Sequence, residues 1–285
     1  MSTLSSLLAP AKINLYLHVV GKRADGFHLL DSLIVFAGTG DYLTVSPHGD
    51  LVLEIDGPFS SGLQHEADNL VLRAARDLAE IAGIDARAHI RLTKNLPIAS
   101  GIGGGSADAA ATLRALAEFW RLDIDGQVLR DLALRLGADV PVCLDGGPSF
   151  IAGIGEEIIP AGQMPAAWLV LVNPRVPTPT PQVFKARRGG FSAEARWSTP
   201  PADAAALASY LKDRSNDLTE AAITVAPIIR DVLAAIGTTA DCLLARLSGS
   251  GATCFGLYAD GPAAETAAAE IRHRHPDWWV VPAPI

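Results

Sequence analysis

The chain has 285 residues, of which 49% are hydrophobic and 19% charged, so it can bury a sizeable core as one large domain or two modest ones. Its net charge of −8 argues against a nucleic-acid-binding protein. Three separated cysteines without a C-x-x-C pair argue against a zinc site or a disulfide framework. There is no signal-peptide pattern and no apolar run long enough to cross a bilayer, so we expect a cytoplasmic protein without membrane partners.

The N-terminal part of the chain is predicted to form β-strands. Residues 11–20 alternate apolar with polar side chains, which is typical of a strand and places Lys12 and Asn14 on one face. Two further strand patterns, 42–46 and 51–55, are joined by a short turn-forming segment. We therefore expect a β-hairpin at this point.

Strand and helix patterns alternate through the next hundred residues. An apolar stripe predicts a helix over residues 69–82, with Asp68 as its N-cap. A strand is predicted over 88–93, and helices over 106–120 and 127–136. A glycine-rich loop joins this strand to the first of these two helices.

The second half of the chain is less regular. Strands are predicted over residues 168–172, 252–258 and 278–281, and helices over 204–212, 227–235 and 262–273. Residues 187–203 are rich in Gly, Ser and Pro, which predicts an exposed excursion. The density of Gly and Pro near residues 150–165 suggests a boundary, and we expect an N-terminal domain of residues 1–158 and a C-terminal domain of residues 159–285.

The loop Pro97–Asp108 has four glycines within five residues and leads directly into a helix. Glycine permits backbone conformations that turn N–H groups inward, and a helix N-terminus adds positive potential, so the loop predicts a phosphate site. A flexible linker or a tight turn is the alternative. The loop lacks the lysine of a Walker P-loop and the last glycine of G-x-G-x-x-G, so a dinucleotide fold is not favoured.

Two charged residues elsewhere in the chain could act on a phosphate held by this loop. Lys12 begins an apolar strand, and Asp139 lies in a turn after a predicted helix. Each alone is compatible with an ordinary structural role. Lys12 could be a strand-end lysine, and Asp139 could be an exposed turn residue or a helix cap. Phosphoryl transfer to an alcohol, however, needs an acceptor for the hydroxyl proton and a cation for the migrating charge, which an Asp–Lys pair would supply.

Three segments together resemble the signature motifs of the GHMP kinases: Pro10–Leu15, Pro97–Ser106 and Leu247–Ala252. The resemblance implies an α+β fold with two domains. The N-terminal domain would be similar to the ribosomal protein S5 domain 2-like fold and the C-terminal domain to a ferredoxin-like fold, with the active site in the cleft between them.

Four further segments resemble one subfamily of these kinases: Arg23–Leu29, Gly103–Gly105, Gly137–Pro141 and Asn216–Leu218. That subfamily transfers phosphate from ATP, with Mg²⁺, to the 2-hydroxyl of a cytidine-diphospho sugar alcohol in isoprenoid (terpenoid) biosynthesis. The resemblance implies a monomer or homodimer and identifies no protein ligand for the metal. Another GHMP kinase with a different alcohol, or a non-catalytic nucleotide-binding regulator, are the alternatives.

The resemblance also assigns roles to individual residues. Lys12 and Asp139 would be catalytic, with Asp139 as general base. ATP would contact Asn69, Lys94, Pro97, Ile98, Ala99, Ser100, Gly101, Ile102, Gly103, Gly104, Gly105, Ser106 and Ala107. The cytidine-bearing substrate would contact Asn14, Phe27, His28, Thr180 and Phe184. The chain departs from the family pattern at Phe27, often tyrosine, and at Ala107, usually serine.

Overall fold

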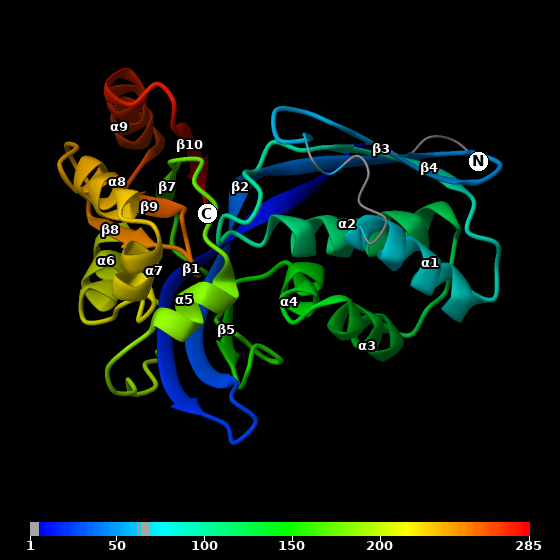
Figure 1. The fold of residues 1–285 in the computed structure, drawn as a ribbon, viewed down its shortest axis with the longest axis horizontal. Helices are drawn as coiled ribbons and strands as arrows, with labels where there is room; N and C mark the ends of the chain where they lie inside the picture. Colours follow the sequence, from blue (N-terminus) through cyan, green and yellow to red (C-terminus); the bar gives the residue numbers. More distant parts are fainter. Residues whose placement is uncertain (1–5, 62, 64–68) are drawn as a thin grey trace. The chain divides into compact units, whose positions relative to one another are not determined.

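The computed structural model describes residues 6–61, 63 and 69–285, which form two compact units (Figure 1). The chain passes between the units several times. The first unit contains Met1–Ala11, Thr39–Ile98 and Gly103–Gly146, and the second contains Lys12–Gly38, Ala99–Ile102 and Gly147–Ile285. Two long strands, β1 (Leu7–Lys22) and β2 (His28–Ser46), contribute residues to both units.

In the first unit, β4 (Ala88–Thr93) lies between β2 and β3 (Leu51–Asp56). It pairs antiparallel with β2 and parallel with β3. The predicted hairpin of 42–46 with 51–55 is therefore wrong. A local turn signal shows that the chain reverses but not which strand pairs with which. Here β3 pairs with β4, which follows it in the chain after a crossover helix, as parallel pairing requires.

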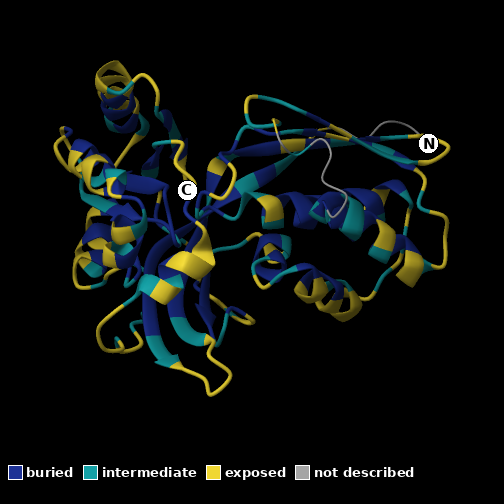
Figure 2. Ribbon diagram, viewed as in Figure 1, coloured by how far each residue is buried: buried dark blue, intermediate teal, exposed yellow. Residues whose placement is uncertain are grey.

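The described residues of the first unit also form the helices α1 (Leu70–Ala82), α2 (Gly104–Phe119), α3 (Gly126–Leu136) and α4 (Val140–Asp145). The Asn69 side chain caps α1 by accepting from Val71 N, and Gly83 ends it at φ 64°. The predicted cap Asp68 lies outside the described residues. Helix α2 packs against both α1 and α4, and it is buried over most of its length, as Figure 2 shows.

The second unit contains an antiparallel sheet in the order β10 (Trp279–Pro284), β7 (Trp168–Asn173), β9 (Cys254–Tyr258), β8 (Leu244–Leu247). Helix α8 (Ile228–Gly237) packs on β8 and β9, and α9 (Gly261–Arg274) packs on β7 and β10. Val170, Val172 and Ile229 belong to the core that these elements share. This arrangement agrees with the expected α+β fold.

The remaining elements of the second unit are short. They are β5 (Ser149–Ala152), β6 (Glu157–Pro160), α5 (Thr180–Ala186), α6 (Ala204–Lys212) and α7 (Thr219–Val225). The sequence patterns missed β5, β6, β8, α4, α5 and α7, because elements of four to seven residues are too short to show a clear period. The strand predicted over 42–46 is only the end of β2, which begins 14 residues earlier, at His28. The other predicted strands and helices are confirmed, with ends that move by a few residues.

Residues 187–203 form neither helix nor strand, as expected, but they are not simply exposed. Asp31 of β2 is fully buried and accepts hydrogen bonds from Arg196 Nε at 2.7 Å and from Ala195 N at 2.7 Å. Trp197 Nε1 donates to Ala161 O at 2.9 Å. The excursion is fixed by these contacts, which a loop composition alone cannot reveal.

Candidate active site

The glycine-rich loop leads into an uncapped helix start. Gly101 and Gly103 have φ values of 76° and 66°, a region that side chains disfavour, and Gly103 is the N-cap of α2. No side chain caps α2 and its first turn has no acidic residue. Its first backbone N–H groups are thus available to an anion, which the helix dipole also favours.

In the second unit, Ser248 joins the three predicted motifs. Ser248 Oγ accepts from Asn14 N at 3.2 Å and donates to Gly101 O at 3.1 Å. Lys12 N donates to Ile102 O at 3.0 Å. A Cβ at Gly101 would lie 2.5 Å from Ser248 O, so only glycine fits this approach. The lysine motif, the glycine loop and the serine–glycine motif therefore converge, although they are far apart in sequence.

The two predicted catalytic side chains belong to different units. Lys12 lies on β1 in the second unit and is buried, with 6% of its surface exposed. Asp139 lies in the first unit, half-buried, directly before α4, and its side chain does not cap that helix. Since Asp139 is not used as a cap, one of its two structural alternatives is removed. Its pairing with Lys12 stays a prediction.

The predicted substrate residues of the second unit include an aromatic stack. The rings of His28 and Phe184 are stacked with centroids 5.1 Å apart and an angle of 26°. Phe27 is 59% exposed. Burial, assisted by the charges of Lys22 and Arg187, lowers the pKa of His28, so its ring is neutral at neutral pH.

Two polar side chains complete this group. Asn14 Nδ2 donates to Ser32 Oγ at 2.8 Å, whereas the buried Asn14 Oδ1 has no hydrogen-bond partner. Thr180 Oγ1 lies 2.7 Å from Ser250 Oγ. A buried carbonyl oxygen without a partner is costly and rare, so Asn14 offers an acceptor that a ligand could satisfy.

The two residues predicted to lie near the nucleotide, Asn69 and Lys94, both belong to the first unit. Asn69 caps α1. Lys94 Nζ is buried between Asp41 Oδ2 at 2.5 Å and Asp108 Oδ2 at 2.6 Å. Neither carboxylate was predicted from the sequence. One signal was present for Asp108, which is the single charged residue between Ser106 and Leu113 in an alanine-rich helix.

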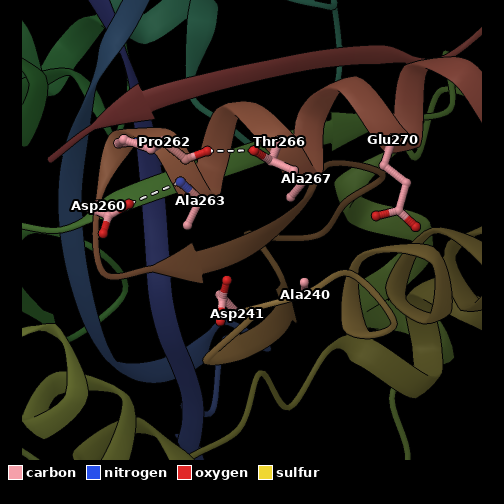
Figure 3. Close-up of a pocket in the computed structure, with 8 residues that line it drawn as sticks. All are labelled: Ala240, Asp241, Asp260, Pro262, Ala263, Thr266, Ala267 and Glu270. Carbon is pink, nitrogen blue, oxygen red and sulfur yellow. Dashed lines mark hydrogen bonds between the residues drawn. The ribbon is translucent and has the colours of Figure 1, made fainter.

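A separate pocket lies along α9, between residues of that helix from its cap to Glu270 and two residues of the turn before β8, Ala240 and Asp241 (Figure 3). None of the predicted site residues lines it. Asp260 is occupied as the cap of α9, accepting from Ala263 N at 3.0 Å, and Thr266 Oγ1 donates to Pro262 O at 2.9 Å. Glu270 also pairs with Arg274 at 2.9 Å, so three of the polar side chains that α9 and its cap contribute to the pocket are bonded within that helix.

No group of three or more His, Cys, Asp or Glu side chains is arranged to hold a metal ion among the residues that the structure describes. Within the same ranges, every helix is too short or too polar to traverse a bilayer.

Two family models match the chain: "GHMP kinases N terminal domain" over residues 69–147 and "GHMP kinases C terminal" over residues 201–277. The 4-diphosphocytidyl-2-C-methyl-D-erythritol kinase of Paramagnetospirillum magneticum is 58% identical over 98% of both chains. The enzyme of the same name from Rhodospirillum rubrum is 54% identical over 95% of this chain and 89% of its own.

Solved structures show the same likeness. A crystal structure of 4-(cytidine 5'-diphospho)-2C-methyl-D-erythritol kinase superposes with a TM-score of 0.80 at 32% identity, covering 98% of each chain. A homoserine kinase from Cytophaga hutchinsonii gives a TM-score of 0.75 at 16% identity, covering 99% of this chain and 95% of its own, and supports the fold alone.

The fold, the joined motifs and both family models define a GHMP kinase, and with it an ATP-dependent enzyme. Within this superfamily the chain belongs to the 4-diphosphocytidyl-2-C-methyl-D-erythritol kinase family.

Proposed function

We propose that this protein transfers the γ-phosphoryl group of ATP to the 2-hydroxyl of 4-diphosphocytidyl-2-C-methyl-D-erythritol, giving the 2-phosphate and ADP, in isoprenoid biosynthesis. Near-full-length identity of 50–58% to kinases named for this substrate supports the proposal. The observation that carries it is the hydrogen bonding of Ser248 to both Asn14 and Gly101, because it joins the three kinase motifs.

The backbone N–H groups of the glycine loop and the first turn of α2 would bind the phosphates of ATP. Asp139 would accept the proton of the 2-hydroxyl while the hydroxyl oxygen of the substrate bonds to the γ-phosphorus. The bond from the γ-phosphorus to the β,γ-bridging oxygen would break, and ADP would leave with that electron pair. Lys12 would offset the charge of the migrating group and keep Asp139 ionised.

Magnesium is proposed to enter as part of the MgATP substrate. Mg²⁺ typically binds to substrate phosphates through few protein ligands and keeps several waters, so it does not require a cluster of acidic side chains. Ser106 lies in the first turn of α2, where the loop ends, and its hydroxyl could contact the Mg²⁺. Ala107, the neighbouring position, offers no second hydroxyl.

The side chains of Phe27, His28 and Phe184 are proposed to recognise the cytosine. Phe27 and Phe184 would stack on its faces, and the neutral His28 ring would accept a hydrogen bond from its exocyclic amino group. The unpartnered Asn14 Oδ1 would accept from a hydroxyl of the substrate. Thr180 would contribute to the same site.

Three further expectations remain proposals. We place the boundary between the family's two domains after residue 158. We also propose that the protein acts in the cytoplasm and that it is a monomer or a homodimer.

Specificity can be tested by an assay that couples ADP release to NADH oxidation. We expect turnover with 4-diphosphocytidyl-2-C-methyl-D-erythritol and competitive inhibition by CDP. Turnover with homoserine or mevalonate instead, without inhibition by CDP, would assign a different GHMP kinase activity. ATP binding without turnover of any alcohol would indicate a regulator.

A further inference from the structure

A buried cluster of three charged side chains lies at the base of the glycine loop in the first unit. Lys94 Nζ donates to Asp41 Oδ2 and Asp108 Oδ2 at 2.5 and 2.6 Å. All three residues are at most 4% exposed. The cluster is not explained by the proposed chemistry, since neither carboxylate is assigned a role in it.

The cluster connects the two ends of the loop. On the strand side, Asp41 Oδ1 accepts from Asn95 N at 2.6 Å and from Leu96 N at 2.9 Å, immediately before the loop begins. On the helix side, Asp108 belongs to the second turn of α2. Lys94 is bonded to both carboxylates, so its ammonium group holds the segment entering the loop against the helix leaving it.

The cluster also lies directly beneath the helix start that would receive phosphate. A Cβ placed on Gly104, the first residue of α2, would be 3.6 Å from both Lys94 Nζ and Asp41 Oδ2. The cluster is therefore adjacent to the residue that begins this first turn.

Charge balance argues that the cluster orients the loop and does not itself attract ATP. Two carboxylates and one ammonium group leave an excess negative charge if all are ionised, and a negative charge beside an anion site opposes binding. Buried ion pairs are also weak contributors to stability, because desolvation offsets their attraction. Since the cluster neither attracts ATP nor contributes much to stability, we assign it the role of connecting the two ends of the loop.

We propose that Asp108, acting through Lys94, is a positioning residue that sets the conformation of the phosphate loop and hence its affinity for ATP. The proposal rests on the proposed kinase function of the same loop. Asp108 touches no reacting atom and acts only by fixing α2 relative to residues 94–96.

The test is the kinetics of Asp108→Ala together with ATP binding by isothermal titration calorimetry. We expect the KM and Kd for ATP to rise about tenfold or more, as for loss of a charge-assisted hydrogen bond, while the KM for the alcohol stays within about twofold. Removal of Asp108 leaves a neutral Lys94–Asp41 pair, so the variant should fold. Asp108→Thr, whose side chain is too short to reach Lys94, provides a second variant.

Asp108→Asn should restore ATP affinity to within about threefold of the unchanged protein, because its amide oxygen still accepts from Lys94. Leu116→Ala is the matched control. It removes a buried side chain of the same helix away from the cluster, so it should lower the melting temperature without changing the KM for ATP.

Unchanged ATP affinity in both Asp108→Ala and Asp108→Thr would overturn the proposal. So would equal increases in the KM of both substrates, or no rescue by asparagine. If the unchanged protein phosphorylates no cytidine-bearing alcohol, the proposed function fails, whereas the ATP titrations of these variants still decide the role of Asp108.

Discussion

Lys94 Nζ lies 2.6 Å from Asp108 Oδ2, and this bond joins the end of β4 to helix α2 beneath the glycine loop. The bond links the segment before the loop to the helix after it. It also creates a buried carboxyl group whose proton affinity differs between the folded and unfolded states.

The first prediction concerns the pH dependence of stability. Burial, only partly opposed by Lys94, raises the pKa of Asp108 from its ordinary value of 3.8 to about 7. The folded state therefore binds this proton more tightly than the unfolded state. The contribution of Asp108 favours folding at low pH and is lost as pH rises through about 7.

Urea unfolding of the unchanged protein and of Asp108→Asn, at pH 5.5 and pH 8, measures this contribution. The unchanged protein should lose more stability between these two values than the variant does. Parallel pH profiles for the two proteins would show that Asp108 does not titrate in this range.

The second prediction concerns the proposed general base. Asp139→Asn should lower kcat by roughly 10²–10⁴-fold, because the amide cannot accept the hydroxyl proton. Binding of ATP, measured by titration calorimetry, should be retained. Asp145→Asn is the control, since Asp145 lies at the end of α4 in the same unit and pairs with Arg130 at 3.1 Å. Turnover of Asp139→Asn within a few-fold of the control would remove the assigned base.

The third prediction concerns His28 and the cytidine group. Burial and the charges of Lys22 and Arg187 lower the pKa of His28 below its usual value of 6.5. The KM for the alcohol should thus be constant from pH 8 to about 6.5 and rise at lower pH, as the ring loses its acceptor nitrogen. His28→Gln keeps an acceptor at every pH and should abolish the rise. The same rise in both proteins would assign it to another group.

The fourth prediction concerns the segment fixed by Asp31. Arg196→Met leaves the buried Asp31 carboxylate without its cation, so it should destabilise the fold by about 2 kcal/mol. This loss is smaller than for a fully buried pair, because Arg196 is partly exposed. Arg188→Met serves as the comparison, because Arg188 is exposed and donates to the carbonyls of Lys185 and Arg187, not to a buried carboxylate. Equal unfolding midpoints for both variants would argue against a fixed segment.

The sequence was most informative where chemistry depends on neighbouring residues. The glycines of the loop and the helix that follows could be read directly, because the φ values of Gly101 and Gly103 are local properties. The strand carrying Lys12 was also predictable, since alternation marks a strand wherever it pairs.

Pairings between distant residues were not predictable in the same way. Asp41 and Lys94 are 53 positions apart, and no local pattern indicates that they form a buried pair. The insertion of β4 between β2 and β3 depends on the same kind of non-local contact. Asp31 gave a weak signal, as a lone acid in the apolar run Leu29–Leu33, but its partner Arg196 lies 165 residues away.

The proposed phosphoryl transfer can be observed by ³¹P NMR of the protein with ATP, Mg²⁺ and 4-diphosphocytidyl-2-C-methyl-D-erythritol. We expect a new phosphomonoester resonance that grows in step with ADP, with the diphosphate signals of the alcohol retained. Formation of ADP and free phosphate alone, or no change while ATP remains bound, would contradict the proposed transfer.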